Sequence, residues 1–295
     1  MSNITAAAVS ELRKATGAGL MACKKSLTKT NGDMKQAMEL LRKEGLAKAD
    51  KKSSLKAAEG LIGIYSDAAN AAVMVEINSQ TDFVNKNPEF QSLIENVAKH
   101  ALNSSGDIEQ IKQLTIADAG INIEQYIKEF SGKIGENIVF RRCADLSVEN
   151  GVISSYVHNA VSGNIGKIAV LIALESNAAD KQKLQDFGRK LAMHIVAMNP
   201  QSINTDSLDP QLIEDEKRIF TEQAKESGKP DNIIEKMVQG RINKFYSEVV
   251  LLEQMFVVDG KTKVSDLIAQ FSKEIGADVT IKNYVKFAVG EGLED

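Results

Sequence analysis

The side chains best suited to chemistry are few and lie far apart in the sequence. His100, His158 and His194 fall in different predicted elements and form no HxxxH or HxxE pair, so no paired metal or base site is indicated. Cys23 and Cys143 belong to no CxxC motif, which argues against a thiolate zinc site or a disulfide framework. No G-x-S-x-G motif is present to place a nucleophilic serine. The sequence therefore predicts a protein that is not an enzyme and that binds no metal or other cofactor.

Two strings near the N-terminus match nucleotide-binding motifs only in part. Residues 17–22, GAGLMA, fit G-x-G-x-x-A, but the residues before them are helical where the dinucleotide motif requires a strand. Residues 24–26, KKS, resemble the end of a P-loop, but no glycine precedes the lysine where the loop needs one for close approach to phosphate, and the residues there are Cys23 and Lys24. We interpret the glycines as a tight link between helices. Leu20 and Met21 then lie at a corner, where they are either core or contact residues.

The string Thr81-Asp82-Phe83-Val84 directly follows an apolar strand that ends at Ser79, and two interpretations of it remain open. In the commoner arrangement, Thr81 or Asp82 caps a short turn and Phe83 anchors the core. In the other, the acid and the ring are displayed at a corner between strand and helix. The ring would then fill a pocket in a partner, and the carboxylate would disturb a cation site there.

Length and composition indicate a globular chain. At 295 residues and 43% apolar content, it is long enough for about two domains with real cores. With 36 Lys and Arg against 40 Asp and Glu, the net charge of −4 disfavours direct binding to nucleic acid or to anionic membranes. The longest apolar stretches, such as residues 168–174, are too short to span a membrane, and the N-terminus lacks a signal-peptide pattern. We expect a cytoplasmic protein.

The first 47 residues predict three short helices that bury their faces against one another. Thr5 and Asp33 stand at N-cap positions, and the third apolar stripe is expected to stop at Gly45. Residues 48–58 are polar and basic without lasting periodicity, so we interpret them as a linker.

An internal repeat follows the linker. Residues 60–79 and 151–176 each predict two strands, and a helical pattern comes after each pair. Residues 137–144 and 279–289 predict a third strand for each unit, giving antiparallel sheets. The sequence thus predicts two related α+β subdomains, residues 59–146 and residues 147–200 with 253–295. The turn between the second pair of strands is longer, so that hairpin is expected to project further.

Residues 201–252 differ in character and predict an inserted helical hairpin. Apolar residues recur in alternating steps of four and three, as is typical of a coiled coil, around a turn at residues 228–230. Two interpretations are equally supported: a hairpin that contacts something outside its own core, and a long excursion with a solvated face.

Several strings occur in an order that carries a resemblance. They are LRKATGAGLMACKK at residues 12–25, NSQTDFV at 78–84, KIGENI at 133–138, LAMH at 191–194, SGKP at 227–230 and EKMVQGR at 235–241. Over nearly its whole length, the chain resembles the bacterial translation elongation factor Ts family. The resemblance implies a guanine-nucleotide exchange factor that binds elongation factor Tu and promotes GDP release. It also implies a ubiquitin-associated-like N-terminal domain, a duplicated core and a coiled-coil hairpin.

The resemblance also assigns site residues. The segment Thr81 to Val84 would intrude into the GTPase and help to dislodge its magnesium, with Asp82 and Phe83 in the principal role. The secondary contacts implied in the same way are Arg13, Leu20, Met21, Lys24, Ile134, Gly135, His158, Val257 and Val258. Some relatives continue with a further helix, and any contact made by that helix would be lost or replaced here. The resemblance leaves open whether two heterodimers pair into a dimer of heterodimers.

Two other classes of function compete with this one. The N-terminal helices could serve as a ubiquitin-like or peptide adaptor, or Asp82 could act with one histidine on a small substrate. A deep pocket that joins Asp82 to a histidine would favour an enzyme, and an exposed Asp82 and Phe83 would not.

Overall fold

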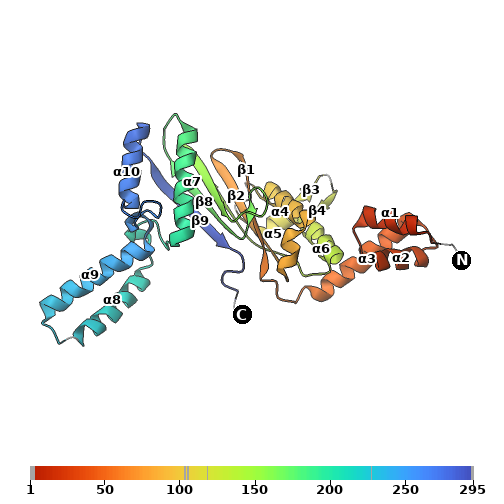
Figure 1. Cartoon of the computed structure of the whole chain (residues 1–295), viewed down its shortest axis with the longest axis horizontal. Coiled ribbons are helices and arrows are strands. Elements are labelled where there is room, and N and C mark those ends of the chain that lie inside the picture. The colour runs from red at the N-terminus through yellow and green to blue at the C-terminus, as the bar shows by residue number, and fades with distance from the viewer. Residues whose placement is uncertain (1–3, 103, 105, 118, 227, 294–295) are drawn as a thin grey trace.

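The computed structural model describes residues 4–102, 104, 106–117, 119–226 and 228–293. Figure 1 shows an elongated molecule with three N-terminal helices at one end, β-sheets in the middle and a helical hairpin at the other end. Helices and antiparallel sheets are mixed in one chain, which confirms the predicted α+β class. Among the described residues, no helix combines the length and apolarity needed to cross a membrane.

Helices α1 Ala6–Thr16, α2 Leu20–Lys29 and α3 Met34–Lys52 pack around a small apolar core. The predicted caps are present, since the Thr5 hydroxyl accepts from the Ala8 N–H at 3.1 Å and the Asp33 carboxylate accepts from the Gln36 N–H at 2.9 Å. Gly17 ends α1 in the left-handed conformation, at φ 64°. The core side chains are Val9, Leu12, Cys23, Leu27 and Ala37.

The prediction that α3 stops at Gly45 is wrong, because the helix continues to Lys52. Gly45 instead faces Gly132 in helix α6, Ile123–Ile134. A Cβ at Gly132 would come within 2.5 Å of the Gly45 backbone, so the two helices cross at a distance that only glycine permits. Residues 48–52 of the predicted linker are therefore helical, and the three-helix unit is joined to the core through α3.

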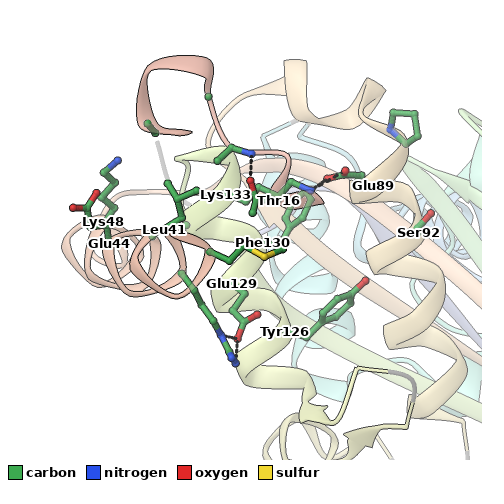
Figure 2. Close-up of a pocket in the computed structure, with 18 residues that line it drawn as sticks. Thr16, Leu41, Glu44, Lys48, Glu89, Ser92, Tyr126, Glu129, Phe130 and Lys133 are labelled. Atoms are coloured by element: carbon green, nitrogen blue, oxygen red, sulfur yellow. Dashed lines mark hydrogen bonds and ion pairs between the residues drawn. The ribbon is translucent and has the colours of Figure 1, made fainter. Parts of the chain in front are cut away.

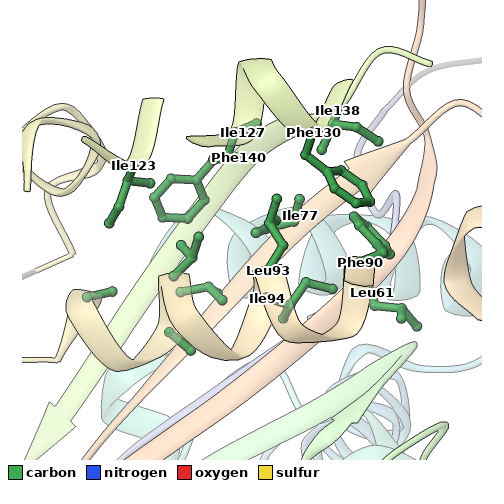
Figure 3. Packing of buried hydrophobic residues seen from close by; sticks show 14 of the residues in the cluster. Leu61, Ile77, Phe90, Leu93, Ile94, Ile123, Ile127, Phe130, Ile138 and Phe140 are labelled. Carbon is green, nitrogen blue, oxygen red and sulfur yellow. The ribbon is translucent and has the colours of Figure 1, made fainter. Parts of the chain in front are cut away.

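The first sheet has the strand order β5-β2-β1-β7, formed by Glu59–Ala68 (β1), Ala71–Ser79 (β2), Val139–Ser147 (β5) and Ile165–Gly166 (β7). Helix α4, Pro88–Ala101, and α6 contribute to the hydrophobic core on this sheet. Figure 3 shows Phe90 of α4 and Phe130 of α6 facing each other, and their ring centroids are 5.8 Å apart. Between these helices lie three short elements that the sequence analysis missed: α5 Ile108–Gln113, β3 Thr115–Ile116 and β4 Ile121–Asn122.

The second sheet repeats the arrangement of the first. Its order is β6-β8-β9, with β6 Gly151–His158, β8 Ile168–Glu175 and β9 Thr280–Ala288. Helix α7, Lys181–Met198, and α10, Val264–Ile275, pack in its core, where the rings of Phe187 and Phe271 stack at 3.9 Å. The predicted strands of both units are present, whereas α10 was not predicted. A third apolar cluster, which includes Ile62, Met74 and Leu171, joins the two sheets.

The expectation that the longer second turn projects outward is wrong. The turn folds back, and β7 within it pairs antiparallel with β1, with Ile62 opposite Gly166. The outer edge of β1 would otherwise present unpaired backbone groups, and this short strand supplies partners for some of them. A Cβ at Gly166 would come within 2.5 Å of the Val157 side chain, so glycine allows the close return.

The inserted hairpin consists of α8 Pro210–Lys225 and α9 Asp231–Val249, which contact each other along their length. The Asp209 carboxylate caps α8, and the Arg241 guanidinium of α9 lies 5.7 Å from the Phe220 ring centroid of α8. Ser227, in the turn, lies outside the described residues. Short 3-10 helices flank the hairpin at Thr205–Ser207 (η2) and Leu251–Glu253 (η3). What the hairpin contacts outside itself, and the predicted domain boundaries, stay predictions.

A buried ion network connects the C-terminal segment to the first sheet. The fully buried Glu76 carboxylate of β2 accepts from Arg141 Nη1 at 2.9 Å, Arg142 Nε at 2.5 Å and the Gly290 N–H at 3.0 Å. Burial alone raises the pKa of Glu76, but the Gly290 N–H and the two guanidinium groups outweigh it, so the pKa lies below its ordinary 4.5. Arg142 also donates to the Ala288 carbonyl at 2.8 Å.

Replacing Glu76 with Gln should lower the free energy of unfolding by about 3 kcal/mol at pH 7, because two largely buried guanidinium groups lose their counter-charge. The contribution of Glu76 is complete above pH 4.5 and is lost as the pH falls below that value, so the difference from wild type should shrink there. Urea unfolding across this pH range measures both effects. Glu291→Gln removes a more exposed partner of Arg142 and should cost less than about 1 kcal/mol; equal losses would contradict the prediction.

The crossing of α3 and α6 leads to a second prediction, which compares alanine substitutions of the two glycines. Gly132→Ala should destabilise the chain by about 1 to 3 kcal/mol, because its methyl group meets the Gly45 backbone. Gly45→Ala places a methyl group at an ordinary 3.6 Å from Gly132, so helix propensity should leave stability unchanged or raise it by up to about 1 kcal/mol. Urea unfolding of the two variants should give opposite shifts, and equal shifts would rule out the close crossing.

Candidate partner-binding surface

The Thr81 to Val84 segment forms the beginning of a short 3-10 helix, η1 Asp82–Lys86, directly after β2. Within this turn the Phe83 ring is 82% exposed, whereas the Val84 side chain is 5% exposed and belongs to the core beneath α4. The interpretation of Phe83 as a core anchor is therefore wrong, because Val84 occupies the core position. Asp82 is also exposed, and among the described residues its carboxylate has no hydrogen-bond or ion-pair partner.

Thr81 holds the start of the turn. Its N–H and its hydroxyl both donate to the Glu136 carboxylate, at 3.0 and 2.7 Å, and its carbonyl accepts from the Ser79 hydroxyl at 2.9 Å. The Thr81 side chain does not cap η1, which differs from the capping role considered from the sequence. Two groups are thus displayed on a turn that is fixed before them by Thr81 and after them by Val84.

The N-terminal site residues Arg13, Leu20, Met21 and Lys24 are all exposed, and the Met21 side chain is 74% exposed. Leu20 and Met21 begin α2 directly after Gly19 and are exposed, so they are not core residues. Their corner lies close to the core, because a Cβ at the preceding Gly17 would overlap the Lys133 side chain of α6.

A cavity of about 610 Å³ lies between the N-terminal helices and the core (Figure 2). Its wall includes Leu41 of α3 and Phe130 of α6, and ion pairs flank it between Lys133 and Glu89 at 2.6 Å and between Arg42 and Glu129 at 2.6 Å. Neither Asp82 nor any histidine lines this cavity. The site therefore gives no support to an enzyme that joins Asp82 to a histidine.

The remaining site residues lie in three places. Ile134 packs partly against the first core, and Gly135, at φ 80°, ends α6 and accepts a hydrogen bond from Lys52 through its carbonyl. His158 is half-buried at the end of β6, with its Nδ1 3.2 Å from the Tyr156 hydroxyl. The structure brings Ile134 and Gly135 close to the Thr81 turn through Glu136, whereas His158 lies in the second sheet.

Val257 and Val258 lie on an exposed turn after η3, and the Val258 side chain is 68% exposed. The sequence analysis missed what holds this turn. Buried His194 accepts the Val257 N–H through Nδ1 at 3.1 Å, and its Nε2 lies 2.9 Å from the Gln254 side-chain oxygen. The imidazole is therefore neutral with its proton on Nε2. The one signal in the sequence was that His194 falls on the buried face of α7. That position indicates a buried histidine but does not show that it bonds to Gln254 and to the Val257 N–H.

Metal-ligating and thiol side chains were the remaining candidates for chemistry. No group of three or more His, Cys, Asp or Glu side chains among them could hold a metal ion. Burial and, to a smaller degree, the Asp145 carboxylate raise the pKa of Cys143 to about 12, so the thiol stays protonated at neutral pH and is a poor nucleophile. Cys23 is buried in the N-terminal core.

An elongated α+β fold with exposed apolar side chains on separate elements (Figure 1) is suited to the class of proteins that bind a large partner over several surfaces. Comparison with known proteins gives the family. The model of the family described as Elongation factor TS matches residues 80–291. The chain is 49% identical over 292 residues to Elongation factor Ts of Bartonella bacilliformis, covering 99% of this chain and 94% of the relative. It is 46% identical over 294 residues to Elongation factor Ts of Rhodospirillum centenum, covering 100% and 95%.

The chain therefore belongs to the elongation factor Ts family, whose role in protein biosynthesis is that of a nucleotide exchange factor in elongation. The family model begins at Gln80, directly before the Thr81 turn, whereas the relatives also match the N-terminal helices.

The His194 arrangement predicts the direction of a titration. Burial lowers the pKa of His194 below 6.5, although the Gln254 hydrogen bond opposes the shift, so the neutral ring is stable in the folded state. This stabilisation is complete above pH 6.5 and is lost as the pH falls through the lowered pKa. NMR titration of the imidazole carbons should give a midpoint below 6.5, with the resonance assigned by its loss in His194→Gln. A midpoint at or above 6.5 would refute the arrangement.

Proposed function

We propose that this chain binds elongation factor Tu carrying GDP and promotes GDP release by inserting Asp82 and Phe83 beside the magnesium and nucleotide site of the GTPase. The observation that carries the proposal is the 82% exposed Phe83 ring on a turn whose next side chain, Val84, is buried. A large aromatic side chain held in water next to a fixed anchor is suited to burial in a partner.

The chain need not touch GDP to release it. A factor that binds the nucleotide-free GTPase more tightly than the loaded form lowers nucleotide affinity, and linkage requires that nucleotide weaken factor binding equally. The Asp82 carboxylate supports this role, because it is exposed and has no partner among the described residues that would neutralise it. Placed near a magnesium site, such a carboxylate would disturb the charges that hold the ion.

The Phe83 ring alone is not enough. Its burial would contribute roughly 1.5 to 3 kcal/mol, which is about one to two decades of affinity. Several contacts must therefore add, and the exposed residues at separate places along the elongated chain supply candidates (Figure 1). We propose as secondary contacts Arg13, Leu20, Met21 and Lys24 on the N-terminal helices, Ile134, Gly135 and His158 on the core, and Val257 and Val258 on the last turn.

The proposal also covers where the protein acts, what it binds and which domains it has. The protein acts in the cytoplasm, without a cofactor and without direct contact to nucleic acid or membrane. Its N-terminal helices form a ubiquitin-associated-like domain, and the α8–α9 hairpin is a coiled coil. The pairing of two heterodimers into a dimer of heterodimers remains an open part of this proposal.

Phe83→Ala should slow factor-stimulated GDP release from elongation factor Tu by about 10- to 100-fold, the loss expected when a buried aromatic contact is removed. Stopped-flow measurement with fluorescent GDP gives the rate, and circular dichroism should show an unchanged fold because the ring makes little contact with its own chain. Leu114→Ala is the control, since Leu114 is another exposed apolar residue, although less so at 39%, and lies outside the proposed contacts. Release as fast with Phe83→Ala as with Leu114→Ala would overturn the proposal.

A further inference from the structure

The exposed turn is attached to the rest of the molecule through Glu136. This half-buried carboxylate accepts two hydrogen bonds from one residue: Oε2 from the Thr81 N–H at 3.0 Å and Oε1 from the Thr81 hydroxyl at 2.7 Å. Hydrogen bonds to an ionised acceptor are stronger than neutral ones, and using both oxygens also fixes direction. Neither the family comparison nor the proposed contacts gives Glu136 a role.

The same loop is bonded to the N-terminal unit on its other side. The Asn137 N–H donates to the Gln80 side-chain oxygen at 2.9 Å, next to Thr81. The buried Asn137 side-chain amide donates to the carbonyls of Ser53 at 3.2 Å and Leu55 at 2.7 Å, directly after α3. Lys52, the last residue of α3, donates to the Gly135 carbonyl.

Residues 135–137 thus form a loop with bonds in two directions, toward the end of α3 and toward the beginning of the turn. We propose that Glu136 is a positioning residue that orients Asp82 and Phe83 before a partner arrives, and that this loop couples the turn to the N-terminal helices. The positioning of the turn by Glu136 is argued from the contacts alone. The effect of that positioning on nucleotide release rests on the proposed function.

The physical need for such a residue follows from the exposure of Phe83. A ring that is 82% exposed has little packing of its own, so its direction depends on its chain neighbours. Val84 fixes the backbone after the ring, and Thr81 fixes it before Asp82. Without the Glu136 carboxylate the first anchor is weakened, and the turn would sample orientations that do not fit the partner. Ordering it again on binding would lower affinity.

The experiment uses the absence of tryptophan from the sequence. In the full-length chain, Phe83→Trp introduces a single tryptophan whose time-resolved fluorescence anisotropy reports motion of the turn. In that background, Glu136→Gln should increase the amplitude of fast local motion, because one acceptor oxygen is replaced by a donor that faces the Thr81 N–H or hydroxyl. Glu89→Gln is the matched control, since Glu89 is a nearby carboxylate in a surface ion pair with Lys133.

Kinetics with Phe83 in place separate positioning from direct contact. Glu136→Gln should raise the factor concentration for half-maximal GDP release about tenfold, the size of one charge-assisted hydrogen bond, and leave the maximal rate unchanged. Phe83→Ala should instead lower the maximal rate. Thr81→Val, which removes the hydroxyl donor, should produce part of the same effect and make Glu136→Gln less damaging in combination. It is also the second variant if Glu136→Gln should fail to fold.

The outcomes distinguish the two proposals. Turn motion that is the same in Glu136→Gln as in Glu89→Gln overturns the positioning role, whatever Phe83 does. Increased motion together with a raised half-maximal concentration supports it. Increased motion with GDP release that is insensitive to both Glu136→Gln and Phe83→Ala supports the positioning role and refutes the proposed function.

Discussion

The close approach of α3 to α6 is the constraint on which the candidate surface depends. Because Gly132 of α6 has no side chain, α3 can pass the core helix closely at Gly45 and bring residues 52–55 to the loop that follows α6. That loop also holds the end of β2, where the exposed turn begins. The N-terminal helices and the turn are therefore connected through backbone and side-chain hydrogen bonds. A partner that contacts both would find the exposed residues of the helices and of the turn already held in position relative to each other.

The candidate surface depends on two adjacent apolar residues that differ in burial. Val84 is buried against α4, whereas Phe83 faces water, and the tight 3-10 turn makes this separation possible over a single step of the chain. An isolated exposed ring is a weak contribution to binding. Under the proposed function, the ring contributes more when it is held in one orientation and acts together with other exposed residues at distant points on the chain.

Much of the frame could be predicted from the sequence because it follows local patterns. The paired strands of both units and the helices after them alternate or repeat with clear periods, and Thr5 and Asp33 cap their helices as expected. Helices α6 and α10 also have legible spacing, at Ile123, Ile127 and Phe130 and at Val264, Ile268 and Phe271, but were not recognised. By contrast, the two-residue strand β7 has no signal of its own, because its existence depends on the free edge of β1.

The sequence by itself determined the α+β class, the duplication, the helical insertion and the family, because periodicity and ordered motifs are properties of the chain. Only the tertiary structure decided that Gly45 lies inside a helix that crosses α6 at Gly132 instead of ending that helix, since a glycine occurs in either setting and the difference lies in what faces it. It likewise decided that Val84 rather than Phe83 fills the core, and that Glu136, far along the chain, anchors Thr81. Such choices depend on contacts between distant segments, and no local preference encodes them.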